Sequence, residues 1–290
     1  MSTQRKKILF VVNTDWAFVS HRLEIAVAAI NKGYDVHIAT ILTDKAQVLI
    51  DYGIKIHPLK MSRSSSGLID NFIIFFNIFV IFNKVKPDLI HLINIKPVLL
   101  GGLAGRILNI PAIVFAVPGL GFSFLDTGFF SILRKIIIEQ LYRLVLCANN
   151  SKVIFQNKDD QKVISNIANL PISKSALICG SGVDLAVFNV KPWPEGTPLV
   201  LMACRLVAEK GVREFVEASV VVRKCVESAG KRVRFVLVGE PDLDCQSKIQ
   251  ISQLNAWHSA GLIEWWGKRS DMNEVLALSS VVVQPSYREG

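Results

Sequence analysis

The chain has 290 residues, 51% of them hydrophobic, and a formal net charge of +9 at pH 7. This length favours two domains, with one large α/β domain as the alternative. The charge favours an anionic partner, a nucleotide or a phospholipid, and not nucleic acid, because no recognition motif or basic–aromatic interleaving accompanies it. The five cysteines are widely separated and lack metal-ligand spacing, so we expect reduced thiols in a cytosolic protein.

Two apolar runs in the first third of the chain are expected to be neither cleaved nor membrane-spanning. The run ILFVVN at residues 8–13 is too short for a signal-peptide core with its cleavage site. The run FIIFFNIFVIF at residues 72–82 falls well short of the roughly 20 residues that cross a bilayer. We therefore predict no targeting peptide and no transmembrane helix.

The chain begins with an alternation of predicted strands and helices. Residues 7–13 and 34–41 are predicted strands, and residues 20–32, followed by Gly33 as a C-cap, form the helix between them. This βαβ unit implies a parallel sheet with right-handed crossovers. No Gly-x-Gly-x-x-Gly follows the first strand, which argues against a dinucleotide-binding domain.

The same alternation continues along the first half. Further strands are predicted at residues 55–59, 87–93, 112–117, 152–156 and 176–179, and helices at 46–52, 68–85, 99–108, 129–147 and from about 158. Asn157 or Asp159 is expected to cap the last of these helices. The sequence GGLAGR at residues 101–106 is interpreted as small residues that let a helix pack closely, rather than as a phosphate loop.

Two of these helices, at residues 68–85 and 129–147, are unusually apolar, and each has two interpretations. Either helix is a core helix packed on the sheet, or it also lies in a membrane interface with nearby cations at the lipid headgroups. The two interpretations are compatible, because only one face of a helix needs to reach lipid. The cations are Arg63, Lys84, Lys86, Arg134, Lys135 and Arg143.

Residues 180–198 separate the two halves. Their glycines, three prolines and lack of periodicity indicate a linker, so we place the domain boundary near residue 191, giving domains 1–190 and 191–290. The alternation then resumes, with Asp271 as the expected N-cap of the last helix. Strands are predicted at 199–203, 233–238, 262–265 and 281–284, and helices at 212–228, 245–258 and 271–278.

Two cations follow the first strand of the second half. Arg205 and Lys210 lie between this strand and the helix that begins near residue 212, with Gly211 as the break. A planar guanidinium and a compact ammonium suit a polyanionic ligand, and open α/β sheets bind ligands at the carboxyl ends of their strands. The alternative is a pair of solvated surface cations.

Two later strand ends carry further candidates for nucleotide contacts. Gly239 and Glu240 follow the strand at 233–238, where a nucleotide is expected to lie. Gly267, followed by Lys268 and Arg269, ends the next strand and would let a base stack against the backbone.

These residues resemble a known family over nearly the whole chain. The sequence CRLVAEKGVREFVEA, which contains Arg205 and Lys210, resembles the Arg-Leu…Glu-Lys-Gly signature of family four of the retaining glycosyltransferases, which have the GT-B fold. LIEWWGKRSDMNEVLALSSVVVQPSYREG resembles that family's run from the nucleobase loop to the donor-sugar loop. NTDWAFVSHRLEIAVAAINKGYDVHIAT resembles the capsule and glycan-assembly branch, which adds sugars to lipid-linked carriers.

The resemblance implies an α/β protein with two Rossmann-like parallel-sheet domains facing a cleft, the second incomplete because the family's second glutamate would lie beyond Gly290. Many relatives have a histidine near Val117-Pro118-Gly119, so the sequence does not identify the acid or base group. The implied roles are catalytic for Arg205, Lys210 and Glu289, donor-binding for Gly239, Glu240, Gly267, Lys268 and Arg269, and acceptor-side for Trp16, His21, Arg22, Gly119 and Gly121.

The implied function is retaining transfer of a sugar, expected to be an N-acetylhexosamine, from a UDP-sugar to a polyprenyl-diphosphate-linked acceptor in surface polysaccharide or glycan biosynthesis. No metal and no other cofactor is expected, and the enzyme would lie on the inner face of the cytoplasmic membrane. One alternative is an inactive module that binds the lipid carrier or the membrane. Another is a nucleotide-sugar 2-epimerase, against which the Arg-Lys signature and the Glu-Gly tail argue.

Overall fold

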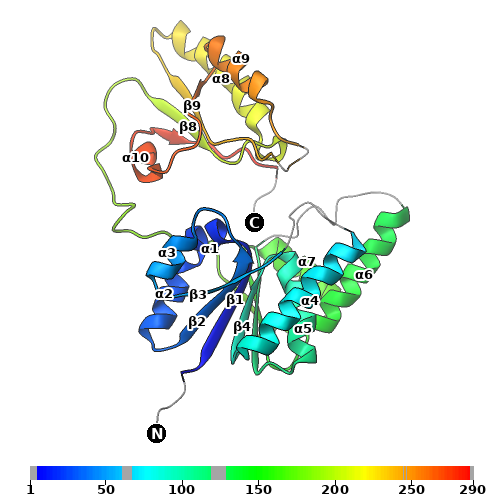
Figure 1. The fold of residues 1–290 in the computed structure, drawn as a ribbon. Helices are drawn as coiled ribbons and strands as arrows, with labels where there is room; N and C mark the ends of the chain where they lie inside the picture. The colour runs from blue at the N-terminus through cyan, green and yellow to red at the C-terminus, as the bar shows by residue number, and fades with distance from the viewer. Residues whose placement is uncertain (1–4, 61–66, 119–128, 244, 246, 288–290) are drawn as a thin grey trace. The chain divides into compact units, whose positions relative to one another are not determined.

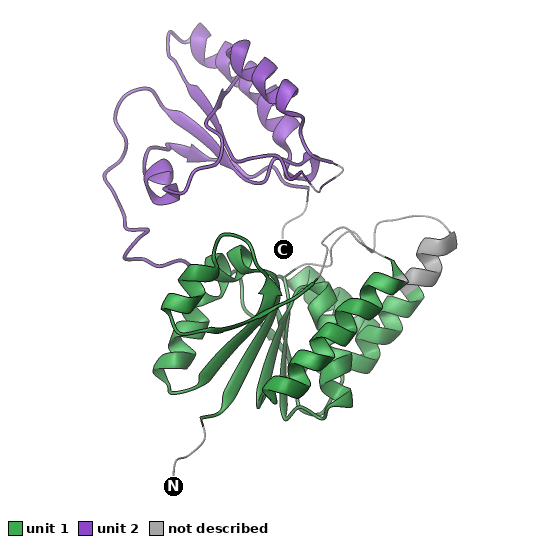
Figure 2. Ribbon diagram, viewed as in Figure 1, with its two compact units in different colours: residues 1–182, 290 green, residues 183–289 purple. Residues whose placement is uncertain are grey.

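The computed structural model describes residues 5–60, 67–118, 129–243, 245 and 247–287. The chain divides into two compact units, residues 1–182 and residues 183–289 (Figure 2). The predicted boundary near residue 191 falls in the extended segment that precedes the first strand of unit 2.

Unit 1 is built on a seven-stranded parallel sheet with the order β3-β2-β1-β4-β5-β6-β7 (Figure 1). Its strands have the apolar composition that a sheet covered on both faces requires. They are β1 (Lys7–Thr14), β2 (Asp35–Ile41), β3 (Lys55–Pro58), β4 (Leu89–Ile93), β5 (Ala112–Val117), β6 (Ser151–Phe155) and β7 (Ser175–Leu177).

Helices cover this sheet on two faces, as the strand–helix alternation predicts. Side chains of α1, α2 and α3 form a core with one face of β1 and β2. Side chains of α4, α5, α6 and α7 form a larger core with the other face. The helices are α1 (Asp15–His21), α2 (Leu23–Asn31), α3 (Ala46–Asp51), α4 (Leu68–Val85), α5 (Gly102–Ile107), α6 (Phe129–Leu146) and α7 (Lys158–Ala168).

The predicted single helix at residues 20–32 is wrong, because α1 begins directly after β1 and the helix breaks at Arg22, whose φ is −136°. The buried carboxylate of Asp15 accepts hydrogen bonds from the backbone N–H of Trp16 (2.7 Å) and of Thr43 (2.8 Å). These bonds fix the start of α1 at the strand end. Arg22 is buried and its Nη1 donates to the His21 carbonyl, which accounts for the break.

The GGLAGR sequence packs as predicted. A Cβ on Gly102 would lie 2.1 Å from Val145 Cγ1 of α6, and one on Gly105 would lie 2.7 Å from Ile90 Cδ1 of β4. These two glycines therefore let α5 approach both the sheet and its neighbouring helix. A π-helical turn, Pro97–Gly101, takes the place of the start of the predicted helix at 99–108.

Unit 2 has a four-stranded parallel sheet with the order β10-β9-β8-β11. Helices α8 and α9 form a core with one face of this sheet, and α10 packs on the other. The elements are β8 (Leu199–Ala203), α8 (Val212–Ser228), β9 (Arg234–Val238), α9 (Ile251–Ser259), β10 (Glu264–Trp265), α10 (Met272–Ala277) and β11 (Val281–Val282).

Helix α9 begins later than predicted, at Ile251, because the preceding segment pairs with the turn after β8. Val207 and Lys248 form an antiparallel bridge, and the Ile249 N–H donates to the Leu206 carbonyl at 3.0 Å. These backbone groups are therefore unavailable to a helix. Sequence periodicity does not report a contact of this kind.

Both predicted N-cap residues occupy the N-cap position of their helix, but of the two only Asn157 makes a side-chain capping bond. Asn157 Oδ1 accepts the N–H of Asp160 at 2.7 Å and so caps α7. Asp271 occupies the N-cap position of α10 but makes no capping bond, because its carboxylate accepts from Arg269, with Nε 2.8 Å from Oδ1. The Asp271 carboxylate therefore binds the Arg269 guanidinium instead of the backbone N–H groups at the start of α10.

Candidate active site

The carboxyl ends of β8, β9 and β10 meet at one edge of the unit 2 sheet and bring the predicted donor-binding residues together. Arg205 lies two residues beyond β8, and its guanidinium Nη1 is 2.7 Å from Asp242 Oδ2. The Arg205 side chain is 55% exposed and that of Asp242 15%, so Asp242 fixes a guanidinium that still faces solvent. An oriented, accessible guanidinium is suited to phosphate oxygens.

Lys210 is held at the same edge by a tight turn. Residues Ala208–Lys210 form one 3-10 turn, and Gly211 follows with φ +75° as the N-cap of α8. A Cβ on Gly211 would lie 2.3 Å from the Pro285 carbonyl oxygen, so this position requires glycine. The Tyr287 N–H donates to the Glu209 carbonyl at 3.0 Å, which holds the segment after β11 against the turn.

Gly239, directly after β9, contacts the backbone beyond β8 and the residues at the end of β10. Its φ is +136°, and a Cβ would lie 1.9 Å from the Cys204 carbonyl oxygen just beyond β8. Its N–H donates to the Gly267 carbonyl at 2.8 Å, and its own carbonyl accepts from Trp265 Nε1 at 2.9 Å. The backbone of β8, β9 and β10 therefore converges at Gly239, where the Cys204 carbonyl occupies the space that a side chain would need.

The remaining donor-side candidates extend from this edge. Glu240 is exposed, and its carbonyl accepts the Leu206 N–H at 3.0 Å. Lys268 and Arg269 are exposed after Gly267, and the Arg269 guanidinium also lies 5.8 Å from the ring centre of Trp266. The structure thus places all described donor-side candidates on one edge, while Glu289 lies outside the described residues.

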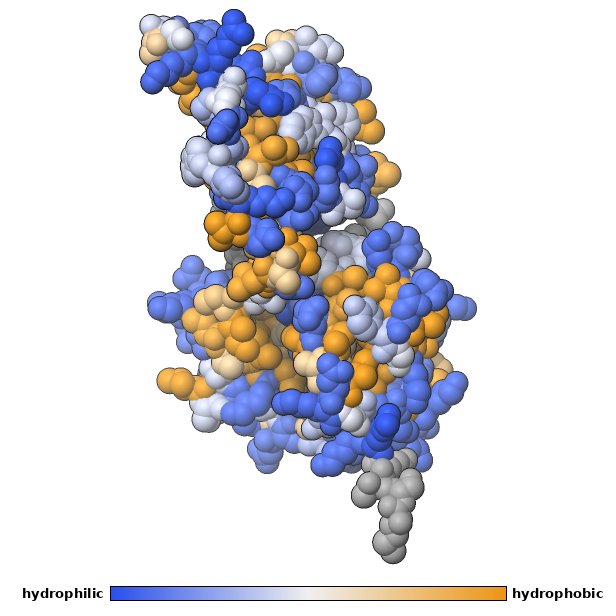
Figure 3. All heavy atoms as spheres, turned by 90° about the vertical axis from the view of Figure 1, so that its left-hand side faces the viewer, coloured by the Kyte–Doolittle hydropathy of each residue, from blue (hydrophilic) through white to orange (hydrophobic). Residues whose placement is uncertain are grey.

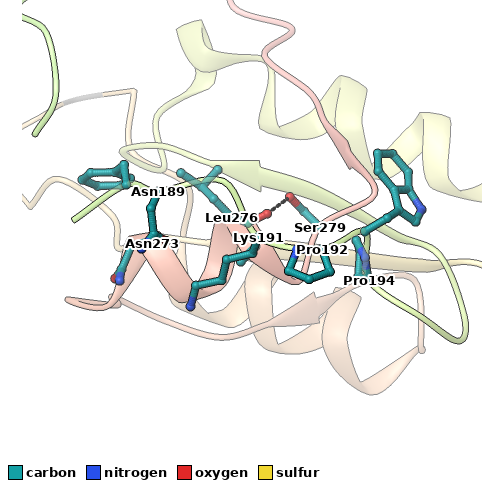
Figure 4. A pocket seen from close by; sticks show the side chains of 10 residues that line it. Asn189, Lys191, Pro192, Pro194, Asn273, Leu276 and Ser279 are labelled. Atoms are coloured by element: carbon teal, nitrogen blue, oxygen red, sulfur yellow. Dashed lines mark hydrogen bonds between the residues drawn. The ribbon is translucent and has the colours of Figure 1, made fainter. Parts of the chain in front are cut away.

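A cavity of about 300 Å³ lies elsewhere in unit 2, between α10 and the segment that precedes β8 (Figure 4). Lys191, Pro192 and Trp193 line it from the segment, and Asn273 and Leu276 line it from the helix. None of the predicted donor-side residues contributes to it. We therefore do not assign the donor site to this cavity.

In unit 1, the strand order changes direction between β1 and β4, where open α/β sheets commonly bind ligands. Trp16 lies in the first turn of α1, directly after β1, and is 37% exposed. Asp15 and Thr43 hold this turn through the Thr43 N–H, which donates to Asp15 Oδ2 at 2.8 Å. The backbone at Trp16 is therefore held at this edge, and the Trp16 side chain is partly exposed there.

His21 and Arg22 lie at the other end of α1. His21 is exposed, and partial desolvation together with the Arg22 charge lowers its pKa. Arg22 is only 8% exposed, its Nη1 donates to Ser181 Oγ at 3.1 Å, and its Nε has no hydrogen-bond partner among the described residues. Their acceptor-side role stays a prediction, as does that of Gly119 and Gly121, which lie outside the described residues.

His91, in the middle of β4, is the most strongly perturbed histidine described. Burial, and then the Arg22 charge, lowers its pKa to about 3, and its ring lies 5.3 Å from that of Phe10. His91 is therefore neutral in the folded protein near pH 7. In the unfolded chain it titrates near its ordinary pKa of about 6.5.

This difference predicts a loss of stability in mild acid. Below pH 6.5 the unfolded chain binds a proton at His91 that the folded chain excludes, so the unfolding free energy falls with pH by up to about 1.4 kcal/mol per unit. We expect His91 to account for about 1.7 kcal/mol between about pH 6.5 and 5.0. Urea unfolding at both pH values measures it, and His91→Phe, which packs beside Phe10 without titrating, should show a shallower loss. An equal pH dependence in both proteins would contradict this assignment.

Comparison with known families matches both units. A family model described as "Glycosyl transferase 4-like" matches residues 7–157, and one described as "Glycosyl transferases group 1" matches residues 197–290. The first match alone covers more than half of the chain. The chain belongs to the family-four glycosyltransferases. The expected resemblance is therefore confirmed, and the protein is a glycosyltransferase.

This glycosyltransferase is 28% identical to the N,N'-diacetylbacillosaminyl-diphospho-undecaprenol alpha-1,3-N-acetylgalactosaminyltransferase of Campylobacter jejuni, over 98% of this chain and 75% of that protein. Its structure is similar to a glycosyltransferase from Rickettsia africae, with a TM-score of 0.68, 18% identity and coverage of 98% and 73%. HepE from Anabaena, solved in complex with UDP-glucose, gives a TM-score of 0.68 at 17% identity, with coverage of 97% and 74%. These similarities confirm the GT-B fold.

Sequence reasoning missed one residue at the carboxyl edge of the unit 2 sheet, the candidate donor edge. Asp242 begins an Asp-x-Asp tripeptide at residues 242–244, directly after the predicted strand end, and that spacing was the available signal. Its pairing with Arg205 joins residues 37 positions apart, so only the folded structure reveals it. The second aspartate of the tripeptide lies outside the described residues.

Proposed function

We propose that this glycosyltransferase moves an N-acetylhexosamine from a UDP-sugar to a polyprenyl-diphosphate-linked acceptor with retention of configuration, in surface polysaccharide or glycan biosynthesis. Two observations support the donor: Arg205 and Lys210 lie at one sheet edge, and the HepE structure contains UDP-glucose. The acceptor is supported by the Campylobacter relative, whose name specifies transfer to an undecaprenol-diphosphate-linked sugar.

In this reaction the bond between the sugar C1 and the β-phosphate oxygen breaks, and an acceptor hydroxyl oxygen bonds to C1. The hydroxyl proton passes to the departing diphosphate. Negative charge therefore grows on the diphosphate as the bond breaks, and Arg205 and Lys210 stabilise it more in the transition state than in the ground state. Backbone close to Gly239 and Gly267 provides the surface for the nucleoside.

We propose that the reaction needs no divalent metal, because two cations supply the positive charge that a metal would otherwise provide. Asp242, the first residue of the Asp-x-Asp tripeptide, is already engaged by Arg205 at 2.7 Å. The acceptor side is assigned to the strand ends of unit 1, beginning with Trp16. An acceptor of this kind carries a lipid, so we also propose that the enzyme works at the cytoplasmic face of the inner membrane.

Nucleotide binding tests the donor assignment. We expect millimolar UDP to raise the unfolding temperature, because a ligand at about 100 times its Kd adds roughly 2.7 kcal/mol of stability. UDP should act equally well in the presence of EDTA. A panel of UDP-sugars then ranks the donors, with UDP-N-acetylhexosamines expected to stabilise most.

Arg205→Ala is the variant that tests the site, since it removes a proposed phosphate contact at an exposed position. We expect this variant to keep its melting temperature without ligand and to lose most of the UDP shift. Stabilisation by no nucleotide, or a shift that survives Arg205→Ala unchanged, would contradict the proposed donor site. A shift that EDTA abolishes would contradict metal independence.

A further inference from the structure

Helix α4 has two opposite apolar faces, and only one of them is packed. Ile74, Ile78 and Phe82 are at most 2% exposed and belong to the unit 1 core. On the opposite side lie five large apolar side chains that are all exposed. These five residues, the α4 stripe, are Ile69 (77% exposed), Phe72 (68%), Ile73 (46%), Phe76 (57%) and Val80 (47%).

The α4 stripe is continuous along the helix. At 100° per residue its five members fall within an arc of about 100°, which is the width of a helix face that normally packs against something. The one polar side chain within this stretch of α4 beyond its first turn is Asn77, whose amide donates to the Ile73 carbonyl at 2.9 Å. Asn77 thus satisfies its amide within the helix, and the stripe presents no polar group that requires a partner.

The exposed apolar residues of α2 and α3 are arranged differently. The face that carries α2 and α3 has apolar patches bordered by hydrophilic side chains (Figure 3). Ile25 of α2 and Ile50 of α3 are 46% and 55% exposed, as individual residues on two short helices. Scattered residues of this kind are normal on protein surfaces, whereas a contiguous stripe indicates an interaction surface.

The start of the α4 stripe lies toward the carboxyl ends of the unit 1 strands, the proposed acceptor side. The C-terminal end of α4 lies at the amino ends of the strands, where Lys7 Nζ at the start of β1 donates to the Val85 carbonyl at 2.9 Å. As a crossover helix, α4 therefore begins toward the carboxyl ends of the strands (Figure 1). Trp16, in the first turn of α1 directly after β1, belongs to the same edge. Exposure along the stripe is greatest at that end, at Ile69 and Phe72.

Charge near the stripe indicates which partner it fits. Lys84 lies one helical turn beyond Val80 and is exposed. Lys86, which follows α4, and Lys60, which precedes the connection to α4, are also exposed. The chain as a whole carries a net charge of +9. Phenylalanines and isoleucines flanked by lysines fit the boundary between acyl chains and anionic headgroups.

We propose that the α4 stripe docks the enzyme on an anionic phospholipid surface, with the helix lying in the plane of the interface. Within the described part of the chain, no helix is long and apolar enough to cross a bilayer, so the contact is one of partial insertion. This inference rests on the proposed function and extends it by naming the surface that meets the membrane. Because α4 begins near the carboxyl ends of the unit 1 strands, docking would also bring these strand ends, the proposed acceptor side, close to a lipid-linked acceptor.

Vesicle binding without any sugar or nucleotide tests the proposal. We expect the wild-type chain to co-sediment with vesicles of phosphatidylcholine and phosphatidylglycerol and to bind pure phosphatidylcholine more weakly. Phe72→Ser combined with Phe76→Ser should lower the partition coefficient by about tenfold or more, because two aromatic side chains lose their insertion. The matched control is Ile25→Ser with Ile50→Ser, which should leave binding within about twofold of wild type.

Two outcomes would overturn the proposal. In one, the phenylalanine variant folds, by circular dichroism and melting temperature, and binds vesicles as well as wild type does. In the other, the wild type ignores vesicles but self-associates through the stripe, so that the stripe is a protein interface. Neither readout involves sugar transfer, so failure of the proposed activity would leave the docking result intact.

Transfer to a short-chain, water-soluble acceptor should be unchanged in the phenylalanine variant.

Discussion

Replacing Lys210 or Arg205 by alanine is expected to lower kcat by roughly 100-fold to 1,000-fold, which corresponds to about 3 kcal/mol of barrier. Both cations lie at the carboxyl edge of the unit 2 sheet, and Lys210 is fixed by the turn that ends at Gly211. Their effect is greatest where charge on the departing diphosphate is greatest, so kcat should fall more than the affinity for the donor. Steady-state kinetics with a UDP-sugar and a soluble acceptor measure both quantities.

Lys224→Ala is the matched control for charge, because Lys224 is exposed in α8 and lies outside the donor edge. It should retain wild-type kcat. Asp242→Asn tests the positioning role of the 2.7 Å ion pair, and we expect a smaller loss than in Arg205→Ala, since the guanidinium remains but is less well held. Wild-type turnover in both the Arg205 and Lys210 variants would contradict their catalytic assignment.

The fold follows from the sequence because buried parallel strands are continuous apolar runs that are easy to recognise. The bounds predicted for α4, α8, β5 and β8 agree with the structure. The failures have tertiary causes. The early start of α1 depends on Asp15 and Thr43, 28 residues apart, and the late start of α9 depends on the bridge between Val207 and Lys248.

The candidate site was partly predictable for a similar reason. Arg205, Lys210 and Gly239 all follow strands, and parallel strands bring their carboxyl ends to one edge. What the sequence does not distinguish is how each glycine is used. Gly239 and Gly267 both have positive φ, but of the two only Gly239 has another strand's backbone in the space of a side chain.

This contrast predicts two very different effects for the same substitution. Gly239→Ala would place its Cβ 1.9 Å from the Cys204 carbonyl oxygen, at a φ of +136° that L-residues rarely adopt. The strand ends must separate, and we expect a loss of more than about 3 kcal/mol of unfolding free energy. A Cβ on Gly267, where φ is +65°, would meet no atom of the described residues within 4 Å. Gly267→Ala should therefore cost only about 1 kcal/mol.

Urea unfolding of the two variants measures this difference, and UDP binding gives it a functional meaning. The carbonyl of Gly239 accepts from Trp265 Nε1, and its N–H donates to Gly267, so displacing it disturbs the strand ends that form the proposed nucleotide surface. Gly239→Ala should therefore lose UDP stabilisation even where it is still folded. Equal destabilisation by the two substitutions would mean that the β8 and β9 ends yield easily, and the donor edge would then be adaptable rather than preformed.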